Sequence, residues 1–297
     1  MSFSSKVKNE ICSQDICDFH KVYSELYAML LFSGKIKQDT ILMSYENENI
    51  VKRLSNMLER VSEELNIKNI YRITEKESKR NSLNIEVLLK DNFIDKNHLE
   101  NPKFEIIQKN YIKEFLRGAF LASGSITDPE IDYHLEFNVS SIKHLEILLS
   151  VINSFKDFNF NPKFIQRRNS YSVYIKENQK IEDFLVLIGA KTSAMDFMQI
   201  KMIKEVRNNI NRSTNFETAN LSKTTESSSE HIKAIKKIKS LKAFDNLPKS
   251  LQETAELRLS NPYTSLSDLA LLHTKPVSKS GVNHRLKKLI KIAENLK

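Results

Sequence analysis

Glycine is scarce in this 297-residue chain, which contains five: Gly34, Gly118, Gly124, Gly189 and Gly281. A dinucleotide-binding fingerprint needs three glycines within six residues, and a P-loop needs two that flank a turn before a lysine. Neither arrangement can be assembled from glycines spaced this far apart. Nucleotide-dependent chemistry of these two kinds is therefore not expected.

Cysteine and long apolar runs are also rare. The two cysteines, Cys12 and Cys17, are too few for a disulfide framework, and with His20 they supply fewer than the four ligands of a zinc site. The longest apolar run, Leu26–Phe32, is far shorter than the ~20 residues of a membrane-spanning helix. Met1–Ile11 lacks the apolar core of a secretory signal. We expect a cytoplasmic protein with no membrane segment, no metal and no cofactor.

Positive charge is concentrated in the last quarter of the chain. The whole chain carries 46 Lys and Arg against 37 Asp and Glu, a net charge of +9. Residues 221–297 hold 15 of the basic and 7 of the acidic residues, so +8 of the excess lies there and the remaining residues are nearly neutral. This distribution predicts a basic C-terminal domain with an acidic partner such as nucleic acid. The polar stretch 208–223 is the expected hinge, or linker, before it.

Two segments about ninety residues apart resemble each other. Leu26–Ile36 reads LYAMLLFSGKI and Leu116–Ile126 reads LRGAFLASGSI, with Ser-Gly-x-Ile at the same place in both. A glycine at the end of an apolar helical run is typical of a helix C-terminus. Ala28 and Gly118 occupy equivalent positions, and such small residues would let two helices approach closely. We infer an internal duplication.

The periodicity after each of these helices predicts the same series of elements. In the first half we expect strands at 35–37, 40–45, 69–74 and 83–89 and a helix at 49–65. In the second half we expect strands at 125–127, 134–139, 163–166 and 171–176 and helices at 142–155 and 181–188. The predicted fold class is therefore α+β: a duplicated α-β-β-α-β-β domain with curved antiparallel sheets over residues 1–207, its repeats at about 1–100 and 108–200.

The repeated helices resemble the LAGLIDADG homing-endonuclease family, in which two such helices pack at a pseudo-dyad and two saddle-shaped sheets lie on DNA. In that motif the acidic residue before the last glycine binds the catalytic metal, and here Ser33 and Ser123 stand in its place. A hydroxyl is a poor ligand for a hard divalent cation compared with a carboxylate. We therefore expect no catalytic residues. An active endonuclease that uses other acids, such as Glu25 or Glu114, is the alternative.

Residues 224–297 have the pattern of an all-α helix-turn-helix domain. A short helix at 265–272, a turn at 273–277 and a basic amphipathic helix capped by Ser278 are the parts of that motif. Lys and Arg neutralise phosphates, and polar side chains near the helix start reach base edges. The candidate DNA-binding residues are Lys279, Ser280, Asn283, His284, Arg285, Lys287, Lys288 and Lys291.

Nearly the whole chain resembles the WhiA family, which joins a degenerate LAGLIDADG domain to a C-terminal helix-turn-helix. The resemblance rests on MSFSSKVKNEI at 1–11, FLRGAFLASGSITDPEIDYHLEF at 115–137, ANLSKT at 219–224, Leu247-Pro248 with Ala255-x-x-Arg258, and SKSGVNHRLKKL at 278–289. It implies a bacterial DNA-binding regulator linked to cell division, chromosome segregation and, in spore-forming lineages, sporulation.

We therefore expect a non-enzymatic, double-stranded DNA-binding regulator of transcription, a monomer associated with the nucleoid. In a further hypothesis the duplicated body chiefly docks RNA polymerase or another regulator, and DNA binding is auxiliary. The residues themselves do not identify the genes or partners involved.

Overall fold

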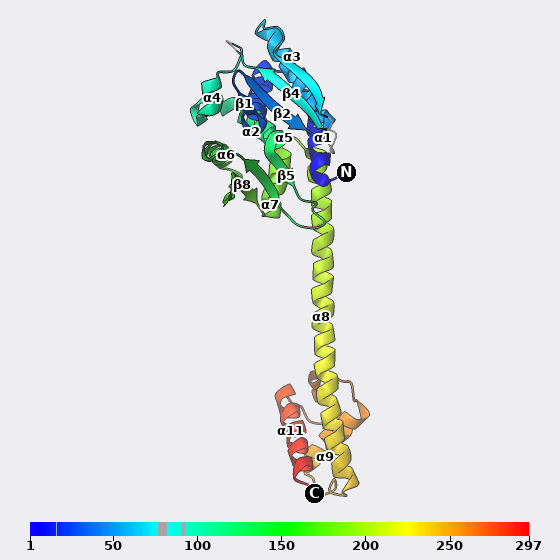
Figure 1. The fold of residues 1–297 in the computed structure, drawn as a ribbon. Coiled ribbons are helices and arrows are strands. Elements are labelled where there is room, and N and C mark those ends of the chain that lie inside the picture. Colours follow the sequence, from blue (N-terminus) through cyan, green and yellow to red (C-terminus); the bar gives the residue numbers. More distant parts are fainter. Residues whose placement is uncertain (16, 77–81, 91–92, 108, 297) are drawn as a thin grey trace. The chain divides into compact units, whose positions relative to one another are not determined.

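The sequence repeat is a structural repeat in the computed structural model, which describes residues 1–15, 17–76, 82–90, 93–107 and 109–296. The first half contains α2 (Phe19–Ser33), β1 (Lys35–Lys37), β2 (Thr40–Tyr45), α3 (Glu48–Glu64), β3 (Tyr71–Lys76) and β4 (Ser82–Leu88). The second contains α5 (Ile112–Ser123), β5 (Gly124–Ile126), β6 (Leu135–Val139), α6 (Ile142–Ser154), β7 (Lys163–Arg167) and β8 (Ser170–Ile175). The predicted α-β-β-α-β-β order is thus confirmed in both halves (Figure 1).

Each half forms a four-stranded antiparallel sheet with the same strand order. The orders are β1-β2-β4-β3 and β5-β6-β8-β7. Alternate side chains point into the core, so Met43 faces Ile85 across β2 and β4, as Phe137 faces Val173 across β6 and β8. The matching order and register support the inferred duplication.

Further elements surround the repeats. They are α1 (Phe3–Cys12), α4 (Lys96–Glu100), the 3₁₀ turns Phe104–Ile106 and Lys109–Tyr111, α7 (Asn178–Leu187) and α8 (Lys191–Ser240). The chain divides into two compact units, Met1–Lys204 and Glu205–Lys297, and the repeats with their core lie in the first. No helix in the described ranges is long and apolar enough to cross a membrane.

The N-terminal helix α1 joins the two halves of the first unit. Its apolar residues Phe3, Val7 and Ile11 are buried in the common core. On its polar side, Lys8 donates from Nζ to the carbonyl of Leu121 at the end of α5, over 3.2 Å. Burial lowers the pKa of Lys8 to about 8.

Glu10 of α1 caps the first turn of α8. Its carboxylate accepts hydrogen bonds from the backbone N–H groups of Thr192 and Ser193, at 2.7 and 2.8 Å, and from the Ser193 hydroxyl at 2.6 Å. The first backbone N–H groups of a helix have no partner within the helix, so an acidic side chain there stabilises it. The N-terminal segment therefore fixes the start of α8, although 182 residues separate Glu10 from Thr192.

The expected hinge at 208–223 is instead helical and belongs to α8. Its composition, rich in Ser, Thr and Asn, is that of a linker, but short hydroxyl side chains can bond to the backbone one turn earlier. Thr224 and Thr225 do so, donating to the carbonyls of Asn220 and Leu221 at 2.9 Å. The segment is thus helical rather than irregular, and its role as a linker between residues 1–207 and 224–297 stays a prediction.

The second unit holds three further helices with a core of their own. They are α9 (Lys249–Ser260), α10 (Leu266–Leu271) and α11 (Lys279–Asn295). Ile235 and Ile238, from the end of α8, pack with Leu251, Leu269 and Leu286 of these helices in one apolar cluster. The short α10, the turn and α11 lie where the sequence predicts them.

We expect Glu10→Gln to lower the free energy of unfolding at pH 7 by about 1–2 kcal/mol, because a neutral amide caps a helix less well than a carboxylate. Burial alone would raise the pKa of Glu10, but the hydrogen bonds from Ser193 and Thr192 outweigh it and lower the pKa. The stabilisation by the Glu10 carboxylate is therefore fully present above the ordinary pKa of glutamate. It is lost as the pH falls through the lowered pKa of Glu10 in the folded protein.

Urea unfolding at pH 7 and at pH 3.5 measures the difference. Glu64→Gln is the control, because Glu64 is exposed at the end of α3 and loses the same charge. Equal effects of the two substitutions at pH 7 would contradict the capping role.

Candidate nucleic-acid interface

Helix α11 begins at a serine cap and has one buried face. The Ser278 side chain accepts a hydrogen bond from the backbone N–H of Gly281 at 3.1 Å. One turn apart along α11, the apolar side chains pack on α9 and α10, and all of them are at most 4% exposed: Val282, Leu286, Leu289 and Ala293. The opposite face is left to solvent.

Six of the eight predicted DNA-binding residues lie on the exposed part of α11. These are Lys279, Ser280, His284, Lys287, Lys288 and Lys291. Helical spacing puts Ser280, His284, Lys287, Lys288 and Lys291 on one surface of α11, and Lys279 adds a fourth ammonium group at the first turn. A row of such groups along a helix matches the negative charge of a nucleic-acid backbone. Asn283 is half-buried at the edge of this surface.

Arg285 turns away from that surface. Its guanidinium Nη1 lies 3.4 Å from both the Ser250 carbonyl and the Thr254 hydroxyl of α9. Helical spacing places Arg285 at the flank of the polar face, but it does not determine the direction in which a long side chain bends. In the structure Arg285 joins α11 to α9.

The turn between α10 and α11 is fixed by α9. The Glu253 carboxylate accepts a hydrogen bond from the backbone N–H of Thr274 at 2.7 Å, and this bond lowers the pKa of Glu253. The buried His273 lies 3.0 Å through Nδ1 from the Leu269 carbonyl and 2.9 Å through Nε2 from the Thr254 hydroxyl. Both contacts hold the turn in one conformation.

Arg258 holds the loop before α10 in one conformation. It is 1% exposed, and its Nη1 donates to the Thr264 carbonyl at 2.8 Å, with longer contacts to Asn261 and Pro262. Carbonyl dipoles, rather than a carboxylate, surround its charge, and burial lowers its pKa. The sequence pattern Ala255-x-x-Arg258 places this arginine on a helix, but helical spacing alone does not show that it is buried.

The two serines that the sequence predicts in place of metal-binding acids lie at the ends of α2 and α5 in the duplicated body. The Ser33 hydroxyl donates to the Met29 carbonyl at 2.7 Å and lies 2.6 Å from the Tyr45 hydroxyl. The Ser123 hydroxyl donates to the Ala119 carbonyl at 3.1 Å. Both hydroxyls are thus engaged within their own helices. Among the described residues no group of three or more His, Cys, Asp or Glu could hold a metal ion.

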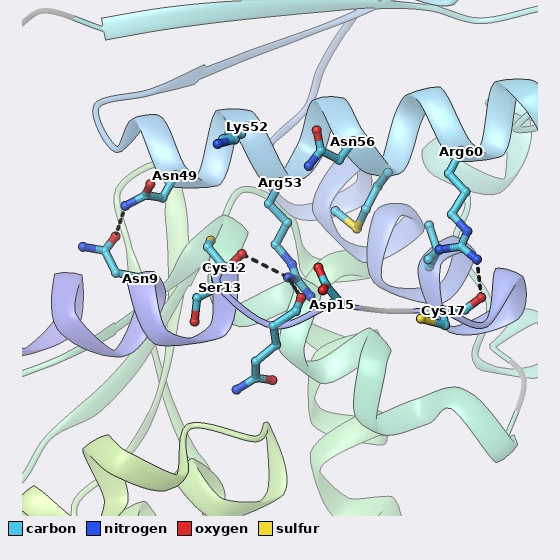
Figure 2. A pocket seen from close by; sticks show the side chains of 13 residues that line it. Asn9, Cys12, Ser13, Asp15, Cys17, Asn49, Lys52, Arg53, Asn56 and Arg60 are labelled. Atoms are coloured by element: carbon cyan, nitrogen blue, oxygen red, sulfur yellow. Dashed lines mark hydrogen bonds between the residues drawn. The ribbon is translucent and has the colours of Figure 1, made fainter.

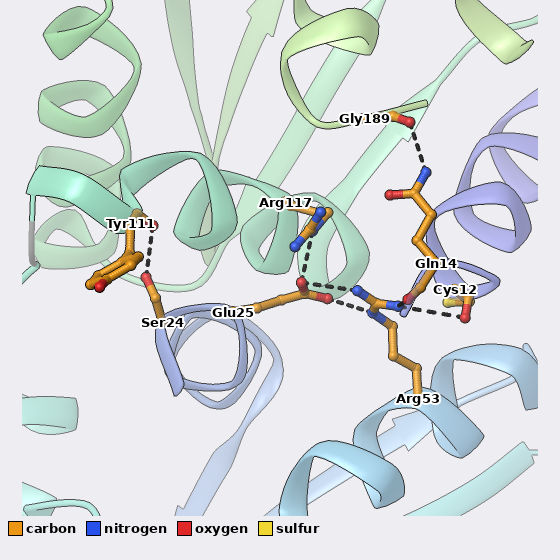
Figure 3. A network of polar contacts seen from close by, with 8 residues as sticks. All are labelled: Cys12, Gln14, Ser24, Glu25, Arg53, Tyr111, Arg117 and Gly189. Carbon is orange, nitrogen blue, oxygen red and sulfur yellow. Dashed lines mark hydrogen bonds and ion pairs between the residues drawn. The ribbon is translucent and has the colours of Figure 1, made fainter. Parts of the chain in front are cut away.

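Glu25, which the sequence offered as an alternative catalytic acid, is also bound by neighbouring side chains (Figure 3). Its fully buried carboxylate accepts from Arg53 Nε at 2.5 Å and from Arg117 Nε at 2.7 Å. Burial alone would lower the pKa of Arg53, but the hydrogen bonds and charge of Glu25 outweigh it and raise the pKa. A carboxylate held by two guanidinium groups inside the protein is a structural ion pair rather than a metal ligand.

Comparisons with known proteins identify the family of both parts of the chain. A family model of the WhiA C-terminal HTH domain matches residues 210–293, and one of the WhiA LAGLIDADG-like domain matches residues 112–207. The chain is 38% identical to probable cell division protein WhiA from Clostridium acetobutylicum and from Clostridium botulinum, over all of its own length and 99% of theirs. The chain belongs to the WhiA family of cell division proteins.

Solved WhiA structures have the same fold. The full-length DUF199/WhiA protein from Thermatoga maritima is 29% identical with a TM-score of 0.63, and the match covers 100% of this chain and 99% of that one. The N-terminal LAGLIDADG domain of DUF199/WhiA is 26% identical with a TM-score of 0.51. That match covers 63% of this chain and 92% of the other. The fold predicted from the repeat is thus the WhiA fold.

Close packing at the pseudo-dyad of this WhiA protein depends on Gly118. A Cβ atom added there would lie 2.2 Å from the Glu25 carbonyl oxygen and 3.0 Å from the Ala28 Cβ, so the helices would have to move apart. We expect Gly118→Ala to destabilise the protein by about 1–3 kcal/mol in urea unfolding. Lys113→Ala, on an exposed position of the same helix, is the control. A stabilised Gly118→Ala protein, as helix propensity alone would give, would contradict this packing.

Proposed function

We propose that this WhiA protein is a non-enzymatic regulator that binds double-stranded DNA through α11. The exposed row of Lys279, Lys287, Lys288 and Lys291 carries the proposal, because these side chains make no hydrogen bond or ion pair with other described residues and project from a helix that α9 holds firmly. Phosphate neutralisation by lysine supplies affinity. Ser280, Asn283 and His284, near the helix start, are positioned to read base edges.

Some of the cations on the sheets of the body are already paired with carboxylates. On the first sheet Arg72 is paired with Glu86, with 2.5 Å between Nε and Oε2. On the second, Arg167 is paired with Glu136 at 2.9 Å, and His134 lies 3.1 Å from the same carboxylate. Each pair nearly cancels its own charge. These ion pairs lower the charge that the sheets offer to DNA, while Lys35 and Lys37 of β1 and Lys163 of β7 stay exposed, so we propose α11 as the main DNA contact and the sheets as a secondary one.

We expect Lys287→Gln together with Lys288→Gln to weaken binding to duplex DNA and to reduce the slope of log affinity against log salt by about 1–2. Each phosphate that a lysine no longer neutralises lowers that slope by about 0.9. Mobility-shift titrations between about 50 and 200 mM salt measure both quantities.

A double variant of Lys113 and Lys156 to Gln is the control, because it removes the same charge from exposed positions of the first unit. An unchanged slope in the α11 variant would overturn the assignment of α11. His284→Ala tests the contact with base edges instead. We expect this substitution to lower the affinity for the preferred DNA sequence more than the affinity for random DNA.

The absence of the metal-binding acids supports a non-enzymatic body. Ser33 and Ser123 stand where carboxylates would hold a divalent cation, and Glu25 is committed to Arg53 and Arg117. We expect no cleavage of supercoiled plasmid by the full chain with Mg²⁺ or Mn²⁺. Reproducible double-strand cutting that survives repurification would show that the protein is an endonuclease.

The relatives' description as probable cell division proteins supports a role in cell division. We extend it to chromosome segregation and transcription control, with a monomeric protein on the nucleoid and sporulation as a further role in spore-forming hosts. Genome-wide occupancy of the full chain, compared with the Lys287 and Lys288 variant, tests this extension. Disappearance of discrete binding sites in the variant is the expected result.

A further inference from the structure

A cavity of about 690 Å³ lies beside α3 in the body (Figure 2). One wall is a single stripe of α3 that includes Asn49, Lys52, Asn56 and Arg60, and the other is the end of α1 with the residues that follow it. Small-molecule sites usually measure about 300–1,000 Å³. The cavity thus has the size of a ligand site, and its lining contains neither Ser33 nor Ser123.

The cavity wall carries more positive than negative charge. Lys52, Arg53 and Arg60 line it, against the one carboxylate of Asp15. Arg53 is compensated by Glu25 behind the wall, but Glu25 also serves Arg117. The Asp15 carboxylate also acts on the Arg53 guanidinium and balances the remaining charge of this group, so the positive excess of the wall is carried by Lys52 and Arg60. An anion is favoured here over a cation.

Two polar groups in the middle of the wall have no partner in the described part of the chain. These are the Lys52 ammonium and the Asn56 amide, one helical turn apart on α3. Their neighbours are engaged: Asn49 donates to the Asn9 side chain at 3.0 Å, and Arg60 donates to the Cys17 carbonyl. Lys52 and Asn56 are thus the groups that a ligand would meet first.

We propose that this cavity binds a small organic polyphosphate, with Lys52 and Arg60 on its phosphates and the Asn56 amide on a polar group of its organic part. Lys52 and Arg60 start about 12 Å apart along α3, a span that suits an extended anion better than a single carboxylate. The scarcity of glycine does not oppose this, because side chains rather than a glycine-rich loop provide the contacts. The proposal does not depend on DNA binding by α11.

Calorimetric titration of the full chain with inorganic pyrophosphate and with ATP tests the site. We expect saturable binding of at least one probe, and Lys52→Gln should weaken it about tenfold, the effect of one charge-assisted contact. Asn56→Leu should weaken the binding of ATP more than that of pyrophosphate, because the Asn56 amide is proposed to contact the organic part of the ligand. Lys52 and Asn56 are exposed, so both variants are expected to fold, which circular dichroism checks.

Lys113→Gln is the matched control and should bind both probes like the unaltered protein. The Lys287 and Lys288 variant should also bind them normally, which separates this site from the DNA contact. The proposal is overturned if neither probe saturates at millimolar concentration or if Lys52→Gln binds as tightly as the unaltered protein. It is also overturned if a short DNA duplex displaces the probe from the unaltered protein and from the α11 variant alike, because the phosphates would then be those of a DNA backbone.

Discussion

The buried carboxylate of Glu25 joins the two repeats of the body. It lies on α2 and is held by Arg53 of α3 and Arg117 of α5, so one side chain connects both halves of the duplication. Burying a lone carboxylate would cost several kcal/mol, and two guanidinium partners offset that cost. The backbone of Gly118 packs on the same residue. Charge and close packing therefore fix the pseudo-dyad at one point.

In this arrangement the packing of the two helix ends does not require a metal ion. Two carboxylates at neighbouring helix ends repel each other unless a cation lies between them. Ser33 and Ser123 remove that repulsion, and their hydroxyls are satisfied by carbonyls one turn earlier. Both serines are half-buried. The Glu25 ion pairs add to the apolar packing that holds the two halves together.

Local patterns were sufficient to predict the repeated elements, because each strand and helix has a periodicity of its own. The strand at 40–45 was predicted to the residue, and Ser278 was correctly expected to cap α11. The contacts of α1 were not predictable from local patterns, because Glu10 accepts a hydrogen bond from the backbone of Thr192, which is 182 residues later in the sequence. The helical conformation of residues 208–223 was not predicted, because the linker was inferred from side-chain composition. The backbone of this segment makes the hydrogen bonds of α8 whatever that composition suggests.

Helical spacing also could not predict the direction in which the arginine side chains point. That direction decides which groups α11 offers to DNA in the proposed function. Residues 224–297 contain two arginines, Arg258 and Arg285, and both donate to carbonyl or hydroxyl groups inside the domain. The planar guanidinium suits such multiple acceptors, while the exposed face of α11 is left with lysines. Arginine is the usual bidentate reader of guanine, so α11 presents little of that readout. In the proposed function, affinity would therefore come from lysine–phosphate contacts, and discrimination from Ser280, Asn283 and His284 together with the shape of the duplex.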